Sequence, residues 1–168
     1  YHGSSFASVV RKVDALSGTL PSKIIVCHLG SGCSITAIKD GKSIDTSMGL
    51  SPLEGVSMGT RVGDIDAGAV VRLGEVLKCS LEDLEKFFYT RSGILGISGK
   101  SNDIRDLLTL EFQGDTRAKL ALDVFVYRIQ KYIGSYVAVL GGLDMLVFCA
   151  TIGERSFVIR ERVCRNLN

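Results

Sequence analysis

The stretch that decides the fold runs from Ile24 to Gly49 and reads Ile-Ile-Val-Cys-His-Leu-Gly-Ser-Gly-Cys-Ser-Ile-Thr-Ala-Ile-Lys-Asp-Gly-Lys-Ser-Ile-Asp-Thr-Ser-Met-Gly. Its first apolar run, residues 24–26, predicts a buried strand, and residues 34–38 and 42–46 predict two further strands. Asp40-Gly41 is typical of the hairpin turn that joins such strands. The stretch therefore predicts consecutive strands joined by tight turns.

The turn Gly30-Ser31-Gly32 is the first candidate for a binding site. Two glycines around one small residue let the backbone turn sharply and bring its amides within reach of an anion. The alternative is an ordinary turn whose glycines only satisfy its geometry. The chain has no Gly-x-x-x-x-Gly-Lys-Ser/Thr motif, and Ile35 stands where a dinucleotide fingerprint would need its third glycine. A phosphate-binding turn is thus a hypothesis that rests on shape alone.

Composition narrows the class of protein. The 168 residues are enough for one domain with its own core. With 20 basic and 18 acidic residues the net charge is +2, which gives no indication that the protein binds nucleic acid or a membrane surface. No apolar run has spanning length. The five cysteines form no Cys-x-x-Cys pair and there are two histidines, which argues against zinc and predicts reduced thiols in a cytosolic protein.

Capping residues and apolar spacing predict the other elements. Strands come first, then helices, then a strand and a helix, an order that favours an α/β fold with a mixed sheet packed by helices. We expect helices at residues 65–77, capped by Asp64, directly after Ser80, at 103–112, at 116–140 and from about 157 to 166. We also expect a strand at 145–150 and glycine-rich loops at 93–99 and 151–156.

Several side chains suit phosphate chemistry. Arg61 lies in a loop bounded by glycines, where its permanently charged fork can reach a phosphoryl group; the alternative is a surface arginine paired with Asp64 or Asp66. His28 directly precedes the turn and either contacts a ligand or is a core histidine. Asp103 is placed to cap its own helix.

Two kinds of residue near the strands have plainer interpretations. Cys27 and Cys33 flank the turn, and we interpret them as packing residues, because apart from His28 nothing beside them would activate a thiol. Asp45 neutralises a cation, positions a metal-bound water, or simply ends an edge strand.

Taken together, the sequence segments of this chain resemble those of the acetate kinase family, in the same order and over essentially all 168 residues. The N-terminal residues Tyr1 to Ser5 resemble a further family segment. The matching strings are His28-Leu-Gly-Ser-Gly32, Asp45-Thr-Ser-Met-Gly49, Pro52-Leu-Glu-Gly55, Met58-Gly-Thr-Arg61, Gly63-Asp-Ile-Asp66, Ser92-Gly-Ile-Leu-Gly-Ile-Ser-Gly99, Arg117-Ala-Lys-Leu-Ala-Leu-Asp-Val-Phe125, Gly141-Gly-Leu-Asp144 and Arg160-Glu-Arg-Val-Cys164.

The resemblance implies the ribonuclease-H-like fold of the acetate and sugar kinase, actin and heat-shock chaperone superfamily. It further implies that residues 1–168 are a single partial domain, the nucleotide-binding C-terminal half, with the N-terminal domain and the extreme C-terminus outside the chain. The first residue is not Met and the last residues are helical in pattern, which agrees with a segment of a longer protein.

The implied activity is reversible, ATP-dependent phosphorylation of acetate to acetyl phosphate by direct in-line transfer. ATP or ADP and Mg²⁺ are the implied cofactors, with the magnesium ligands outside this chain, so that the chain alone would be inactive. A cytoplasmic homodimer without nucleic-acid or membrane partners is implied for the full-length protein. The alternatives are a propionate or short-chain acyl kinase and a non-catalytic nucleotide-binding module.

The resemblance also assigns roles residue by residue, and it assigns no metal ligand. His2 and Arg61 match the two residues that stabilise the transition state. The implied nucleotide contacts are His28, Leu29, Gly30, Ser31, Gly32, Asp103, Ile104, Arg105, Thr151, Ile152, Gly153, Glu154 and Arg155. The chain departs from the family at Ser31, where Asn is frequent, at Phe6, where His is usual, and at Thr151 and Arg155, which replace Gly and Asn.

Overall fold

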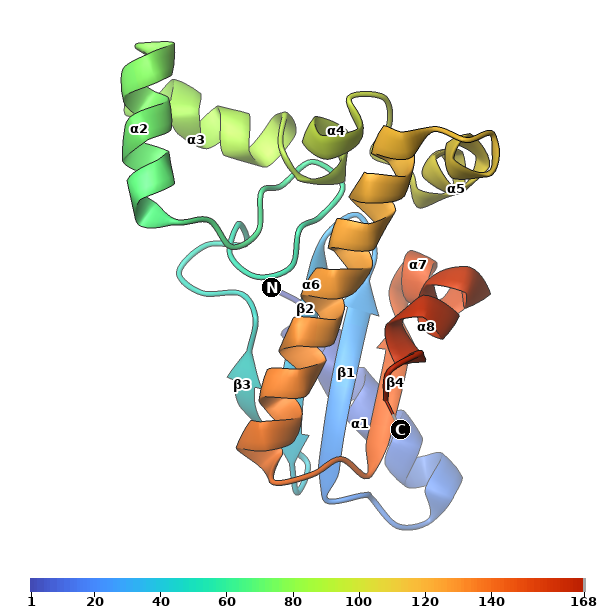
Figure 1. Cartoon of the computed structure of the whole chain (residues 1–168). Coiled ribbons are helices and arrows are strands. Elements are labelled where there is room, and N and C mark those ends of the chain that lie inside the picture. The colour runs from blue at the N-terminus through green and yellow to red at the C-terminus, as the bar shows by residue number, and fades with distance from the viewer. Residues whose placement is uncertain (168) are drawn as a thin grey trace.

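A mixed four-stranded sheet organises the structure, a computed structural model that describes residues 1–167. Its strands lie in the order β3-β2-β1-β4 (Figure 1). β1 pairs with β2, and β2 with β3, in antiparallel register, whereas β4 runs parallel to β1. The strands are β1 (Lys23–Leu29), β2 (Cys33–Lys39), β3 (Lys42–Thr46) and β4 (Met145–Cys149).

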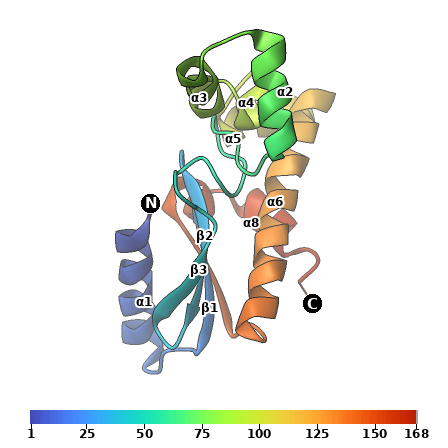
Figure 2. The same cartoon turned by 90° about the vertical axis from the view of Figure 1, so that its left-hand side faces the viewer.

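Helices cover both faces of this sheet. Figure 2 shows α1 (Gly3–Ser17) on one face and α6 (Thr116–Leu140) on the other. Successive side chains of a strand point to opposite faces, so β1 is buried on both sides. Ile25 and Cys27 pack in the core under α6, while Ile24 and Val26 pack under α1. The expected α/β class with a mixed sheet is confirmed.

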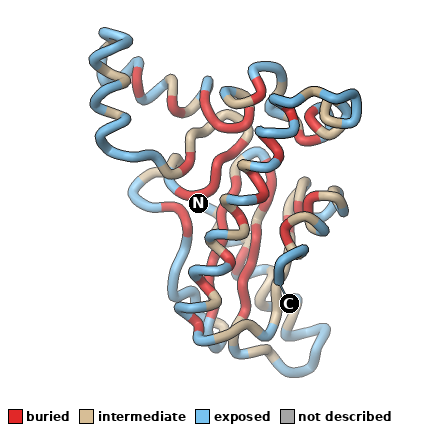
Figure 3. The backbone as a smooth tube through the Cα atoms, viewed as in Figure 1, coloured by how far each residue is buried: buried red, intermediate tan, exposed pale blue. Residues whose placement is uncertain are grey.

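The remaining helices lie at one end of the sheet and around α6. Figure 3 shows that buried residues concentrate in the strands and along one side of α6. None of the helices within residues 1–167 combines the length and apolar character needed to cross a membrane. These helices are α2 (Ala67–Leu77), α3 (Leu81–Thr90), α4 (Gly93–Ser98), α5 (Ile104–Phe112), α7 (Ala150–Arg155) and α8 (Phe157–Cys164).

Several predicted boundaries are confirmed because local capping chemistry decides them. α6 begins and ends as predicted: Asp115 accepts hydrogen bonds from the amides of Arg117 and Ala118, and Gly141, at φ 69°, ends the helix. Ser80 caps α3 by accepting from the amide of Asp83, and Asp103 caps α5.

Four predictions of local structure are wrong. Asp66, not Asp64, caps α2, accepting from the amide of Ala69, because Asp64 is held by contacts distant in sequence. Residues 93–98 form α4 instead of a glycine-rich loop, and residues 150–155 form α7 instead of a turn. The last helix ends at Cys164, two residues before its predicted end.

Candidate functional site

The turn at residues 30–32 joins β1 to β2 at the end of the sheet. The amide of Gly30 donates to the carbonyl of Gly32 over 3.2 Å. Within residues 1–167 the amides of Ser31 and Gly32 have no acceptor. A Cβ atom on Gly32 would lie 3.3 Å from Arg61 Nη1 and 3.5 Å from His2 Nε2. Glycine therefore leaves a space bordered by backbone donors, a guanidinium and an imidazole.

The two histidines stack beside this turn. Their ring centroids are 3.7 Å apart and the planes differ by 13°. His2 Nδ1 lies 2.7 Å from Ser34 Oγ, and His28 Nδ1 lies 3.0 Å from Ser5 Oγ. Phe6 places its ring edge-on against both imidazoles. The phenyl ring at this position thus supports the stack from the side of α1.

Both imidazoles are neutral near pH 7. Burial, together with the neighbouring His28 ring and the charge of Arg61, lowers the pKa of His2 to about 4. Burial also lowers the pKa of His28. Two neutral rings can stack closely without charge repulsion, and each then carries a single N–H donor.

Arg61 is positioned by backbone contacts of its loop. Its carbonyl accepts from the amide of Met58 over 3.1 Å, and the carbonyl of Met58 accepts from the amide of Ile94 over 2.9 Å. Gly93, at φ 60°, makes this approach possible, since a Cβ there would lie 2.2 Å from the Met58 carbonyl oxygen. The first turn of α4 therefore fixes the loop that carries Arg61.

The guanidinium of Arg61 keeps its charge available. It lies 5.9 Å from the ring centre of Tyr89 and 3.9 Å from Met58 Sδ. No carboxylate of residues 1–167 lies within ion-pair distance of it. The alternative pairing with Asp64 or Asp66 is therefore wrong for this structure.

Asp64 instead ties the Arg61 loop to α6. Its carboxylate accepts from the Tyr132 hydroxyl at 3.0 and 2.9 Å and from the amide of Gly55 at 2.9 Å. Arg128 donates to the Asp64 carbonyl over 3.1 Å and lies 3.6 Å from its carboxylate. Tyr132 stands among apolar residues that recur at helical spacing, so nothing in the sequence signals this bond.

The start of α7 brings segment 151–155 close to the turn at residues 30–32. A Cβ on Gly30 would lie 3.5 Å from Ala150 Cβ, and one on Gly153 would lie 3.6 Å from the Cys27 carbonyl. Ala150 adopts φ 64°, a left-handed conformation that costs an L-residue roughly 1–2 kcal/mol. Of the predicted contacts, Thr151, Glu154 and Arg155 are exposed, Ile152 is half-buried and Gly153 is buried.

The segment 103–105 borders the Arg61 loop from the other side. A Cβ on Gly59 would lie 3.4 Å from the carbonyl oxygen of Asn102. Asp103 accepts from the amide of Arg105 over 2.8 Å and pairs with its guanidinium over 2.6 Å, contacts that lower the pKa of Asp103. Ile104 is buried in the core. The capping alternative for Asp103 is confirmed, and only its carboxylate and Arg105 extend outward.

Buried side chains at the site limit which groups can contact a ligand. Leu29 is buried like Ile104, so either residue can offer only its backbone. Cys27 and Cys33 are fully buried, and burial raises the pKa of both thiols, which confirms their packing role. Asp45 lies on the edge strand β3, where the Tyr136 hydroxyl donates to it over 3.5 Å.

The site therefore joins an uncommitted guanidinium, two neutral imidazoles and two backbone amides around one turn. Such donors stabilise an anion, and a phosphoryl group above all, because its charge is spread over several oxygens. Residues 1–167 contain no group of three or more His, Cys, Asp or Glu side chains placed to hold a metal.

The chain as a whole matches a known family. The sequence model of the acetokinase family matches residues 1–168. The chain belongs to the acetokinase family. It is 53% identical to the acetate kinase of Dictyoglomus thermophilum over 169 residues and 49% identical to that of Bacteroides thetaiotaomicron, covering 99% of this chain in each case.

Solved structures of the acetokinase family share its fold. The crystal structure of Porphyromonas gingivalis acetate kinase superposes with a TM-score of 0.96 at 40% identity, over 99% of this chain and 42% of that one. A propionate kinase from Francisella tularensis superposes with a TM-score of 0.93 at 42% identity, over 99% and 43% of the two chains. The acetokinase chain described here spans about 42% of the length of the curated relatives that it matches.

Proposed function

We propose that the chain is the nucleotide-binding C-terminal half of an acetate kinase, which reversibly transfers the γ-phosphoryl group of ATP to acetate. The observation that carries the proposal is the guanidinium of Arg61, which has no carboxylate partner within residues 1–167 and lies over the Gly32 turn beside His2. Family membership and the similarity to proteins named acetate kinase support it.

The proposed transfer needs positioned charge more than a nucleophile from the protein. In phosphoryl transfer, charge spreads over the equatorial oxygens of the moving group. The amides of Ser31 and Gly32 would orient the phosphates, Arg61 would bind the transferring group with its planar fork, and His2 would donate from its neutral ring. None of these residues forms a covalent bond with the substrate.

The shape of the turn suits the phosphates of a nucleotide. The space that a Cβ on Gly32 would fill, with Arg61 Nη1 at 3.3 Å, suits a phosphate oxygen. We assign the adenosine end to α7, which lies beside the turn, and a further nucleotide contact to Asp103 and Arg105, whose segment borders the Arg61 loop. We propose that the ligands for Mg²⁺ belong to the rest of the protein; residues 1–167 hold no group of three or more His, Cys, Asp or Glu side chains placed around one point.

The proposal extends to the whole protein. We place the full-length enzyme in the cytoplasm as a homodimer without nucleic-acid or membrane partners. The five cysteines are free, which agrees with a reducing compartment. A non-catalytic nucleotide-binding module is the competing function, and it predicts nucleotide binding without acyl phosphate formation.

Propionate kinase is a second candidate because a propionate kinase shares the fold with a TM-score of 0.93. Acetate, propionate and butyrate should be assayed side by side with the full-length protein, trapping the acyl phosphate as hydroxamate. We expect the highest kcat/KM with acetate. A higher value with propionate would reassign the substrate, and no hydroxamate with any acid would reject the kinase function.

Arg61→Ala tests the role of the guanidinium. We expect kcat to fall about 100-fold or more, the size found when one transition-state donor is removed, with partial activity in Arg61→Lys. Arg72→Ala is the matched control, since Arg72 is exposed on α2 and pairs only with Glu75 in the next helical turn. Turnover of Arg61→Ala equal to that of the control would refute the assignment.

A further inference from the structure

Each stacked histidine is held at Nδ1 by a serine from another element. Ser34 of β2 lies 2.7 Å from His2 Nδ1, at the start of α1, and Ser5 of α1 lies 3.0 Å from His28 Nδ1, in β1. The opposite nitrogens face the turn. His2 Nε2 would lie 3.5 Å from a Cβ on Gly32, and His28 Nε2 would lie 3.8 Å from a Cβ on Gly30.

Cys149 gives the Ser5 hydroxyl a second hydrogen-bond partner beside His28. Cys149 Sγ lies 3.7 Å from Ser5 Oγ and 3.7 Å from His28 Nδ1. Burial raises the pKa of Cys149, so the sulfur keeps its proton and can act as a weak donor. When the thiol donates to Ser5 Oγ, the single hydroxyl proton of Ser5 is left for His28 Nδ1. The proton of the neutral His28 ring is then on Nε2.

Ser34 has a simpler environment. Its hydroxyl is buried at 1% exposure and has no partner within residues 1–167 other than His2 Nδ1. A neutral imidazole has one N–H, so the hydrogen bond at Nδ1 decides whether Nε2 presents a proton or a lone pair. A lone pair would repel phosphoryl oxygens, whereas a proton attracts them.

We propose that Ser34 is a positioning residue that donates to His2 Nδ1 and thereby fixes the His2 ring with its Nε2–H directed at the phosphate-binding turn, and that Ser5 fixes His28 in the same way. This inference rests on the proposed kinase function for its catalytic consequence. The two serines set both the tautomer and the orientation of two N–H donors, and the stack with Phe6 at its edge keeps the rings from turning.

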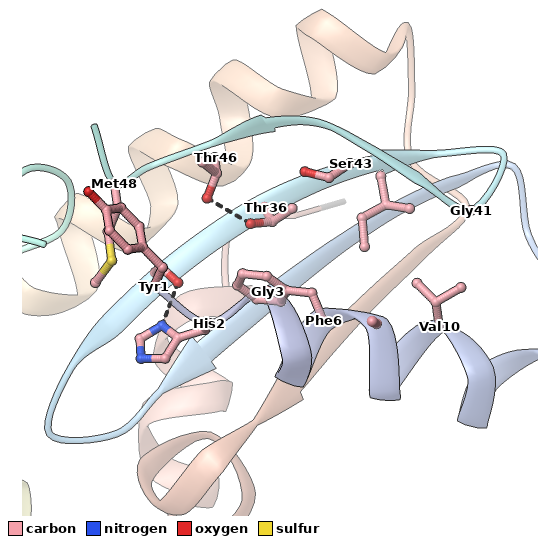
Figure 4. A pocket seen from close by; sticks show the side chains of 13 residues that line it. Tyr1, His2, Gly3, Phe6, Val10, Thr36, Gly41, Ser43, Thr46 and Met48 are labelled. Carbon is pink, nitrogen blue, oxygen red and sulfur yellow. Dashed lines mark hydrogen bonds between the residues drawn. The ribbon is translucent and has the colours of Figure 1, made fainter. Parts of the chain in front are cut away.

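A cavity beside Ser34 makes the residue testable. It has a volume of about 280 Å³ and lies between α1 and the strands β2 and β3, with Ser34 among its lining residues. Figure 4 shows His2 at one end of this cavity and Gly41 at the other, with Phe6 and Val10 opposite Thr36. The cavity offers room for the extra methyl group of Ser34→Thr, a variant that keeps the hydroxyl.

The tautomer can be read directly from ¹⁵N chemical shifts of labelled histidines in the full-length protein. We expect Nδ1 of His2 and His28 to show the shift of an unprotonated ring nitrogen and Nε2 that of a protonated one. In Ser34→Ala the His2 signals should move toward the average of the two tautomers, with the His28 signals unchanged. A protonated Nδ1 on His2 in the wild type, or an unchanged pattern in Ser34→Ala, would overturn the proposal.

Kinetics supply the second readout. Loss of one hydrogen bond to a donor that acts in the transition state should lower kcat of Ser34→Ala about tenfold, with KM for ATP changed less than about twofold. Ser34→Thr should restore kcat. Thr36→Val is the matched control, because Thr36 is equally buried on the same strand face and its hydroxyl bonds to Thr46 over 2.8 Å, away from the histidines.

The two readouts separate this inference from the proposed function. A wild-type kcat in Ser34→Ala would overturn the positioning role even if the enzyme makes acetyl phosphate. If the wild type makes no acyl phosphate with any acid, the kinase proposal fails, while the ¹⁵N pattern still confirms or overturns the assigned tautomer.

Discussion

His2 and His28 lie ring on ring at the end of the sheet, and their closeness makes charging either ring costly. Burial lowers both pKa values, and the charge of Arg61 adds to this effect at His2. Both imidazoles are therefore neutral in the absence of a bound phosphate. A neutral imidazole donates through one nitrogen only. The serine at Nδ1 therefore decides which nitrogen of each ring is the donor.

The low pKa of His2 predicts a pH-dependent stability. In the unfolded chain His2 takes up a proton below its ordinary pKa of 6.5, whereas in the folded chain it does so only at about 4. The unfolded state therefore binds more protons between these values, and the free energy of unfolding falls as pH is lowered from about 6.5 to 4. Urea denaturation of the full-length protein at several pH values measures this slope.

His2→Gln provides the comparison for that experiment, because carboxylates also titrate at the lower end of the range. The variant should lose less stability than the wild type between pH 6.5 and 4.5. Equal losses in the two proteins would show that His2 is not the group responsible.

Some residue-scale features are visible in the sequence and others are not. The glycines of the turn and an arginine between glycines are typical of phosphate sites, so Gly30, Gly32 and Arg61 could be named as candidates. Ser5 and Ser34 could not, because a serine in a helix or strand has many uses. Only the packing of α1 against the sheet brings each hydroxyl to a histidine.

At the scale of elements, the loop at residues 47–66 is unusual because it carries Arg61 without being a helix or strand. Its order comes from three neighbours: the first turn of α4, the end of α3 and the middle of α6. The carbonyl of Thr60 accepts from the amide of Ser92 over 2.9 Å, and its hydroxyl donates to the carbonyl of Tyr89 over 2.8 Å.

Tyr132→Phe tests the attachment of this loop to α6. The variant removes the hydroxyl that donates to Asp64 and leaves a half-buried carboxylate with one partner fewer. We expect a loss of roughly 1–3 kcal/mol in the free energy of unfolding and a lower kcat, because Arg61 lies three residues from Asp64. Urea denaturation and hydroxamate assays of the full-length protein measure both effects.

Tyr127→Phe is the control on the same helix, since Tyr127 is 59% exposed. It should leave stability and turnover unchanged. If both variants behave like the wild type, the contact between Asp64 and α6 does not hold the loop.

Elements were predictable where local chemistry decides them. Apolar residues at helical spacing, with Asp115 before them and Gly141 after them, define α6. The apolar runs and tight turns of residues 24–46 predict three consecutive strands. Asp64 and Asp66 are equally good caps by sequence, and a tyrosine 68 residues away decides between them. α4 and α7 are six residues each, too short to show helical periodicity.

At the scale of the whole molecule, burial is uneven. The sheet and α6 contain the two cores, whereas α2 has no buried residue and presents Val71 and Val76 to solvent at 65% and 61% exposure. Figure 1 shows α2 with α3 at the end of the molecule away from the strands. Regions with few buried contacts open at low free-energy cost.

Hydrogen exchange should reveal this difference in burial between α2 and the sheet. We expect amides of α2 to exchange orders of magnitude faster than those of β1 and the buried side of α6 in the full-length protein. Exchange followed by mass spectrometry resolves the segments, with α5 as an internal comparison because it contributes Ile104 and Leu107 to the core. Equal protection of α2 and α6 would mean that another part of the protein or a partner covers α2.

The parallel pairing of β4 with β1 has a consequence for folding speed. His28 and Cys149, paired across these strands, are 121 residues apart, whereas β1 and β2 are joined by a three-residue turn. Closing so long a loop costs conformational entropy, which is offset only after the contacts between β4 and β1 have formed. We therefore expect β4 to dock after the hairpins and α6 have formed. α7 follows β4 directly, which makes completion of the proposed nucleotide site one of the last events of folding.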